Sequence, residues 1–263
     1  MRPIWTGALG FGLVTLPVQL YSATAGTGLD LDLLHKNDLS PIRYARVCRK
    51  DGKEIPYEDI VRGYEYSDGD YVVLTESDFK NANVRKTQLI DVVSFTSESE
   101  VDPIYSEKPY YLEPIEGSEK AYVILREALK KSKKVGVAKF VLREREHLGI
   151  VKPVGNVLVL DQLRFASEVK APKGLKIPER EPSGKEINMA LELIGELTEH
   201  FKPEKFHDTY TEELEEMIDL KAKGKKPIQK GKTIETTKSR DLMEALKASL
   251  EKARKGRPQY HEA

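Results

Sequence analysis

The chain has 263 residues, enough to bury a substantial core as one large domain or as one domain with an appendage. Lysine plus arginine and aspartate plus glutamate both number 43, so the net charge does not indicate a polyanionic partner. The single cysteine, Cys48, excludes an intramolecular disulfide framework and is typical of a reducing compartment, and no run of about 18 apolar residues could span a membrane.

The first 115 residues carry the signals of β-strands. Apolar residues alternate from Leu9 to Leu13 and again from Val14 to Leu20, with a phase change of one residue that predicts a β-bulge. Short β-rich runs at 72–74 and 89–95 follow, and turn sequences such as 67–70 separate the runs. This pattern predicts a mainly antiparallel barrel or sandwich.

After Gly117 the apolar period changes to that of a helix. Ser118 is the expected N-cap, Gly136 lies beyond the expected C-terminus, and one face holds Ala121, Ile124, Leu125, Ala128 and Leu129. Strand character returns at 135–142 and 157–163, with 151–156 as the expected connection.

Helical patterns dominate the last third of the chain. Ser183 forms a capping box with Glu186 and precedes an apolar stripe of Ile187, Ala190, Leu191, Ile194 and Leu197. A further helix is expected after Thr209, boxed with Glu212, burying Leu214, Met217 and Ile218. Seven lysines between 221 and 238 indicate a flexible basic linker, and Ser239 caps a last helix with a narrow stripe of Leu242, Leu246 and Leu250.

Charge is distributed unevenly along the chain. Basic residues exceed acidic ones over 116–180 and 221–263, while acidic residues exceed basic ones over 61–115 and 181–220. The first basic zone has many lysines and arginines but only three aromatic residues, which favours contact with duplex phosphates over single-strand stacking. The alternative is that Lys130, Lys131, Lys133 and Lys134 only complement a helix C-terminus.

Several segments in order resemble the prokaryotic Ku family, whose homodimers thread onto broken DNA ends for non-homologous end joining. They are RPIWTGALGFGLVTLPVQLYSA from Arg2, LLHKNDLSPIRYARVC from Leu33, DIVRGYEYSDGDYVVL from Asp59, EVDPIYSEKPYYLEP from Glu100, KAYVILREALKKSKKVGVAKFVLREREHLGIVKP from Lys120 and LVLDQLRFASEV from Leu158. The resemblance implies an α+β fold with a mainly antiparallel, SPOC-like β-barrel core, a bridge or arm region and C-terminal helices.

The resemblance also implies domain limits and partners. The Ku core would span 1–220, with bridge strands over about 137–165 and helices at about 183–220 that embrace the other protomer. A Lys-rich linker at 221–238 and a short helix within 239–263 would follow. That helix would recruit the multifunctional ATP-dependent DNA ligase through Leu242, Leu246 and Leu250, its alternative being to fold back on the core.

The resemblance favours phosphate contact by basic residues in three stretches. Those in the bridge-like stretch are Lys139, Arg143, Arg145 and Lys152, and the two arginines share strand parity and so would face one side. A second group follows Leu33, and a third lies at the helix end: Lys36, Arg43 and Arg46, then Lys130, Lys131, Lys133 and Lys134.

No catalytic residue, cofactor or metal site is expected, so the chain is not predicted to be an enzyme. Some relatives carry a second cysteine where this chain has Asp51, and Cys48 without a CxxC pair cannot form a thiolate zinc site. Two other functions are alternatives: a metal-dependent nuclease using the acidic residues Glu212, Glu213, Glu215, Glu216 and Asp219, and a general RNA-binding scaffold. The expected location is the cytoplasm, associated with the nucleoid.

Overall fold

The computed structural model describes residues 1–26, 28–83, 88–179, 181–225 and 242–256. The chain divides into two units, Met1–Pro172 and Lys173–Ala263. The division falls before residue 220, the predicted end of the core.

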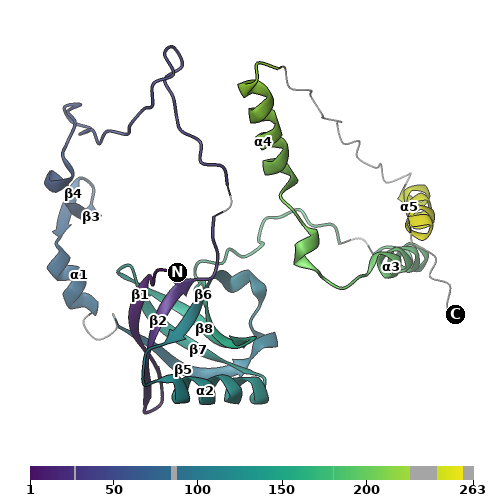
Figure 1. Cartoon of the computed structure of the whole chain (residues 1–263), viewed down its shortest axis with the longest axis horizontal. Helices are drawn as coiled ribbons and strands as arrows, with labels where there is room; N and C mark the ends of the chain where they lie inside the picture. The colour runs from purple at the N-terminus through teal and green to yellow at the C-terminus, as the bar shows by residue number, and fades with distance from the viewer. Residues whose placement is uncertain (27, 84–87, 180, 226–241, 257–263) are drawn as a thin grey trace. The chain divides into compact units, whose positions relative to one another are not determined.

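The first unit contains a closed barrel (Figure 1). Its strands follow the order β1-β2-β6-β9-β8-β7-β5, and every neighbouring pair is antiparallel except β1 and β5, which pair in parallel and close the barrel. The prediction of a mainly antiparallel barrel is therefore confirmed. The strands are β1 (Trp5–Phe11), β2 (Val14–Ser22), β5 (Leu89–Ser97), β6 (Ser106–Pro114), β7 (Lys134–Leu142), β8 (Arg145–Val154) and β9 (Val157–Leu163).

The remaining elements lie outside the barrel wall. A separate two-stranded sheet and a short helix interrupt the chain between β2 and β5, and further helices follow the strands. They are β3 (Arg62–Ser67), β4 (Asp70–Leu74), α1 (Glu76–Asn83), α2 (Glu119–Ser132), α3 (Gly184–Leu197), α4 (Thr209–Ala222) and α5 (Leu242–Gly256). Four 3₁₀ turns are η1 (Tyr57–Asp59), η2 (Glu98–Glu100), η3 (Pro103–Tyr105) and η4 (Pro203–Lys205).

The barrel interior is filled by alternate side chains of its strands. On β2, for example, Leu16, Val18 and Leu20 are all buried. Helix α2 seals one end with Tyr122, Leu125 and Leu129, which belong to the same cluster. The predicted apolar face of this helix was partly wrong, because Ile124 and Ala128 are exposed and Tyr122 is buried in their place.

Two predicted irregularities have different structures from those expected. The phase change after Leu13 is a tight hairpin between β1 and β2, with Gly12 at a positive φ of 60°, and not a bulge. The stretch 151–156, predicted as a connection, mostly belongs to β8, and only Gly155 and Asn156 form the turn into β9. Helix α2 ends at Lys133, which adopts a left-handed conformation, while Gly136 lies within β7.

The strand directions define two ends of the barrel. One end, called here the excursion rim, is where residues 23–88 leave the barrel after β2 and return at β5, and where β7 turns into β8. The opposite end, called the helix rim, holds the β1–β2 and β8–β9 turns and is crossed by α2 (Figure 1). Strand β7 runs from the helix rim to the excursion rim.

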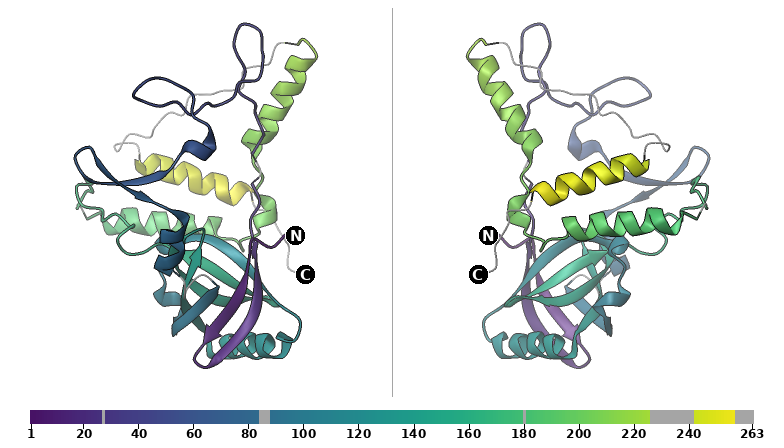
Figure 2. Two further views of the ribbon diagram at one scale, coloured as in Figure 1. Left: turned by 90° about the vertical axis from the view of Figure 1, so that its left-hand side faces the viewer. Right: turned by 90° about the vertical axis from the view of Figure 1, so that its right-hand side faces the viewer.

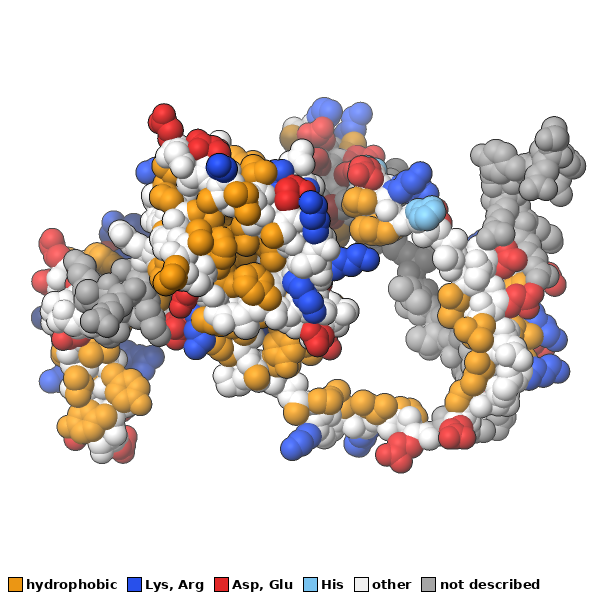
Figure 3. Space-filling model, turned by 90° about the horizontal axis from the view of Figure 1, so that it is seen from below, with side chains coloured by type: hydrophobic (Ala, Val, Ile, Leu, Met, Phe, Trp, Pro, Cys, Tyr) orange, Lys and Arg blue, Asp and Glu red, His pale blue; other side chains and the backbone are white. Residues whose placement is uncertain are grey.

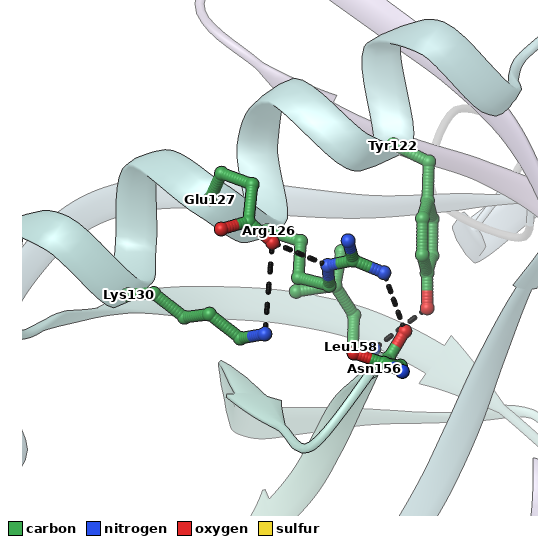
Figure 4. Close-up of polar contacts among 6 residues, drawn as sticks. All are labelled: Tyr122, Arg126, Glu127, Lys130, Asn156 and Leu158. Atoms are coloured by element: carbon green, nitrogen blue, oxygen red, sulfur yellow. Dashed lines mark hydrogen bonds and ion pairs between the residues drawn. The ribbon is translucent and has the colours of Figure 1, made fainter.

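Polar contacts fix α2 to the helix rim (Figure 4). The Tyr122 hydroxyl donates to the Leu112 carbonyl oxygen at 2.8 Å and accepts from the Leu158 backbone N–H at 2.6 Å. Arg126 Nη1 donates to the Asn156 carbonyl oxygen at 2.7 Å. Ser118 is the N-cap residue, but its hydroxyl donates to the Pro17 and Ile115 carbonyl oxygens and does not cap the helix.

In the second unit, α3 and α5 pack against each other (Figure 2). The capping box of Ser183 and Glu186 at the start of α3 is confirmed. Helix α4 is capped instead by Asp208, whose carboxylate accepts from the Thr211 backbone N–H. The predicted burial along α4 was wrong for Met217 and Ile218, which are exposed, while Leu214 is half-buried.

Candidate nucleic-acid interface

The β7–β8 hairpin tip on the excursion rim carries four charged residues in a row, Arg143, Glu144, Arg145 and Glu146. Arg143 and Glu144 both have positive φ, 51° and 64°, as a two-residue hairpin of this handedness requires. Asn-Gly would normally form such a turn, because side chains without special backbone freedom rarely adopt this region. Two long charged side chains therefore occupy an unfavourable position at an exposed tip, which is typical of functional sites.

This geometry corrects the predicted strand parity of the two arginines. Arg143 lies in the turn, while Arg145 begins β8 and pairs with Leu142. The two side chains are exposed at one hairpin tip and do not alternate along a single strand. Neither arginine has a carboxylate within salt-bridge distance among the residues that the structure describes.

Two further basic residues lie at or near the excursion rim. Lys108 of β6 places its Nζ 5.7 Å from the centroid of the Tyr110 ring. Burial raises the pKa of Tyr110, and the nearby Arg143 charge opposes this rise. Arg62 of β3 donates from Nη1 to Glu144 Oε2 at 2.6 Å. The rim therefore brings together basic residues from β3, β6 and the β7–β8 turn, beside the acidic residues Glu107, Glu144 and Glu146.

The lysines predicted from the end of α2 lie at the other end of the barrel. Lys134 donates to Ser97 Oγ at 2.8 Å, and Lys152 donates to Glu98 Oε1 at 2.8 Å. Lys130, Lys133 and Lys134 line a groove of about 540 Å³ beside η2. Since β7 has nine residues, its helix-rim and excursion-rim ends are separated by roughly 27 Å. Lys131 is exposed on α2 at the same end.

The predicted basic residues at the two ends of the barrel thus form separate groups and not one surface. Lys139 lies between them, exposed on β7 and opposite Asp91 of β5. Lys134 joins β7 to the end of β5, and Lys152 joins β8 to η2, while Lys130 pairs with Glu127 within α2, so part of this group has a structural role in the barrel.

The remaining candidates lie on the excursion of residues 23–88. Lys36 is exposed in a turn between Leu34 and Pro41, which form an isolated β-bridge. Arg43 Nη2 lies 3.5 Å from Glu54 Oε1, and the Arg46 guanidinium stacks 5.0 Å from the centroid of the Tyr57 ring. A stacked guanidinium keeps its N–H groups available at the edge for a phosphate.

The stretch predicted as bridge strands, about 137–165, lies mostly in β7, β8 and β9 of the barrel wall. The segment that departs from the wall is instead the excursion, which includes the β3–β4 sheet and α1. Sequence patterns could not separate these alternatives, because both segments contain short strands.

The leucine stripe predicted for ligase recruitment is not free. Leu250 is only 6% exposed and Leu246 is half-buried, because α5 packs on α3. The Leu242 side chain and the predicted cap Ser239 lie outside the described residues. The structure therefore shows α5 folded against its own chain, which is the alternative to a free ligase-binding stripe.

The part of the chain that the structure describes contains no cluster of three or more His, Cys, Asp or Glu side chains that could hold a metal ion. The acidic residues of α4 are exposed along the helix. Cys48 is a half-buried free thiol. Within the described ranges, no helix is long and apolar enough to cross a membrane.

Residues 10–189 match the family described as the Ku70/Ku80 beta-barrel domain. The chain belongs to the Ku family. Relatives named non-homologous end joining protein Ku include those of Opitutus terrae, with 43% identity covering 95% of this chain and 91% of the relative, and Coxiella burnetii, with 37% identity covering 97% and 96%. Among solved structures, the SPOC domain of human PHD-finger protein 3 aligns at 15% identity and a TM-score of 0.31, covering 62% of this chain and 95% of that domain.

Two rim residues of this Ku chain were absent from the predicted set. Arg62 and Lys108 are separated in sequence from the main basic zone and lie in segments with more acidic than basic residues. Lys108 reaches the excursion rim through the strand pairing of β6 in the barrel, and Arg62 reaches the β7–β8 turn through its side-chain contact with Glu144. The available signal was their position within the DIVRGYEY and EKPYYLEP segments that resemble the family.

Proposed function

We propose that this chain forms a homodimeric ring that binds double-stranded DNA ends without sequence preference. The ring would recruit and stimulate an ATP-dependent DNA ligase in double-strand break repair by non-homologous end joining, without catalysis of its own. The observation that carries this proposal is the excursion rim. Here residues 23–88 leave the barrel and return to it, beside a hairpin tip that exposes Arg143 and Arg145.

The relatives support this proposal. The relative from Bacillus subtilis, also named non-homologous end joining protein Ku, is 35% identical, and the match covers 97% of this chain and 83% of the relative. Such coverage includes the barrel, the excursion and the helical unit together. The shared name therefore concerns a protein with the same set of segments.

For DNA contact, the excursion-rim residues are the first candidates. Arg143 and Arg145 would contact phosphates from the barrel side, with Lys139 below them on the wall. Lys36, Arg43 and Arg46 would contact phosphates from the excursion. Backbone contacts carry no sequence information, so binding would be independent of sequence. The helix-rim group, Lys130, Lys131, Lys133, Lys134 and Lys152, would contribute less, since it lies at the opposite end of β7.

Homodimerisation is supported by an uncovered apolar stripe on α3. Ile187, Leu191, Ile194 and Leu197 are 43%, 58%, 61% and 63% exposed, although they repeat at helical spacing. Figure 3 shows apolar side chains in a row along this helix. Contiguous exposed apolar surface of this kind is typical of protein interfaces. We infer that a second copy of the chain covers it, as the prediction of dimer-embracing helices requires.

Ligase recruitment would involve α5. Because Leu246 and Leu250 contact α3 in the chain alone, the ligase would have to displace α5 from α3 or bind its exposed face. Either mode leaves the barrel unit unchanged. End binding would therefore depend on the barrel unit, and ligase recruitment would depend on α5.

The experiment that tests the function is a gel-shift comparison of one duplex in three forms: linear, closed circular, and linear with both ends blocked by bulky caps. Binding confined to free ends supports a threaded ring. Equal binding to the closed circle would contradict the proposal and leave an open DNA-binding surface. The logarithm of the affinity should also fall with the logarithm of salt concentration, by about 0.9 per phosphate contacted.

A further inference from the structure

Arg62 connects two parts of the chain that are 82 positions apart. It begins β3 on the excursion, and its Nη1 lies 2.6 Å from Oε2 of Glu144 in the β7–β8 turn of the barrel. The hydrogen bond to Glu144 is the main cause of a raised Arg62 pKa, so the guanidinium stays charged throughout the physiological range.

The same guanidinium also contacts α1. Its Cζ lies 5.0 Å from the centroid of the Phe79 ring, and the charges of Glu76 and Tyr57 add smaller contributions to the raised pKa of Arg62. The start of α1 is held by Asp78, whose carboxylate accepts from the backbone N–H and hydroxyl of Thr75. Arg62 therefore joins β3, α1 and the barrel turn at one point.

The position of Glu144 is unexpected for a DNA-binding tip. A carboxylate between two arginines repels phosphate, and its backbone has a positive φ that is uncommon for glutamate. Binding of Arg62 by this carboxylate would explain why a glutamate occupies the position despite the repulsion of phosphate and the positive φ. The pairing neutralises Glu144 and places the excursion beside the arginines that flank it.

We propose that Arg62 and Glu144 are positioning residues that form a clasp between the excursion and the barrel, and that the clasp slows release of a bound DNA end. The inference rests on the proposed function. With the clasp closed, residues 23–61 form a loop anchored at both ends on the excursion rim, by the end of β2 and by Arg62. With the clasp open, β3 and the start of α1 are no longer held at the β7–β8 turn.

We expect the Arg62–Glu144 ion pair of the clasp to be weak. The Arg62 and Glu144 side chains are 65% and 50% exposed, and exposed ion pairs contribute little and are screened by salt. We expect disruption of the clasp to change the DNA dissociation rate by roughly two- to five-fold and not to abolish binding.

Glu144→Gln is the decisive variant because its two possible effects have opposite signs. Removing a negative charge beside Arg143 and Arg145 would by itself slow DNA release, whereas opening the clasp would accelerate it. Arg62→Gln and the charge-swapped pair Arg62→Glu with Glu144→Arg complete the set. Asp68→Asn is the matched control, since it removes one negative charge from the β3–β4 turn and no salt bridge of Asp68 is found among the described residues.

The experiment measures dissociation of full-length protein from a fluorescent linear duplex, together with hydrogen exchange of residues 62–79 in the DNA-free protein. We expect faster release and faster exchange for both glutamine variants, partial restoration by the swapped pair, and wild-type values for Asp68→Asn. Slower or unchanged release with Glu144→Gln, or unchanged exchange, overturns the clasp. Failure of the wild-type chain to bind linear ends would instead contradict the proposed function, and the exchange data would still test the clasp.

Discussion

The barrel and the helical unit differ in where their large apolar side chains lie. In the barrel, Leu9, Leu16 and Leu158 are almost completely buried within one chain. On α3, Leu191 and Ile194 are more than half exposed although their spacing is equally regular. Regular apolar spacing therefore indicates a buried face but does not show whether the covering surface belongs to the same chain. The barrel buries its apolar side chains within one chain, whereas the apolar stripe of α3 stays exposed in the part of the chain that the structure describes.

The largest expected effect is on stability, and it should differ between the two units when a leucine is replaced by alanine in each. Leu158→Ala removes a fully buried side chain and should lower the free energy of unfolding by about 2–5 kcal/mol, because it leaves a cavity in the barrel. Leu191→Ala in the matched position on α3 should cost much less in a monomer. Urea denaturation monitored by circular dichroism measures both. Equal decreases in stability would show that α3 is packed as tightly as the barrel.

The next effect concerns dimerisation. Leu191→Glu combined with Ile194→Glu places two charges on the exposed stripe, and a buried interface cannot accommodate unpaired charges. The dimer should weaken at least about ten-fold while the barrel stays folded. Size-exclusion chromatography with light scattering measures the mass. A dimer of unchanged stability would exclude this stripe from the interface, and Lys185→Gln on the same helix is the control.

A smaller effect distinguishes the two rims of the barrel. Arg143→Glu with Arg145→Glu should weaken duplex binding uniformly across sequences and flatten the salt dependence by about 0.9 for each phosphate that is no longer neutralised. Lys130→Glu with Lys133→Glu reverses the same number of charges at the helix rim and should have less effect. Fluorescence anisotropy titrations at several salt concentrations provide the comparison. A stronger effect of the Lys130 and Lys133 substitutions would indicate that DNA binds beside α2 and not at the excursion rim.

The smallest change in DNA affinity is expected from the C-terminal segment. Removing residues 237–263 should leave end binding close to that of the full chain but impair stimulation of the ligase. Nick-sealing and end-joining assays with and without the truncated protein measure the second effect. A failure to bind DNA after this deletion would show that the removed segment, and not the excursion rim, supplies a main DNA contact.

Much of the fold could be predicted from local patterns. The alternation on β2, the helical period of α2 and the Ser183–Glu186 box each depend on neighbouring residues alone. Strand β8 was partly missed because Pro153, followed by Gly155 and Asn156, resembles a turn sequence. The Arg143–Glu144 turn lacks the Asn or Gly that would have identified it.

The site was less predictable than the fold. The lysines near the end of α2 and the arginines after β7 are close in sequence, but β7 places them at opposite ends of the barrel. Conversely, Arg62 and Glu144 are far apart in sequence and in contact in space. Charge counts along the chain cannot contain this information, because it arises from strand direction and register.

The parallel pairing of β1 with β5 has consequences for how the barrel folds and for the insertions that it tolerates. The barrel cannot close until its last strand, β9, has been synthesised, and the parallel seam pairs Ala8 with Leu89, so closure depends on contacts distant in sequence. The cost of closing a flexible loop rises slowly, by roughly 0.6 kcal/mol for each doubling of its length. Insertions within the excursion are therefore inexpensive for the barrel, and the excursion can vary in length while the β1–β5 seam is preserved.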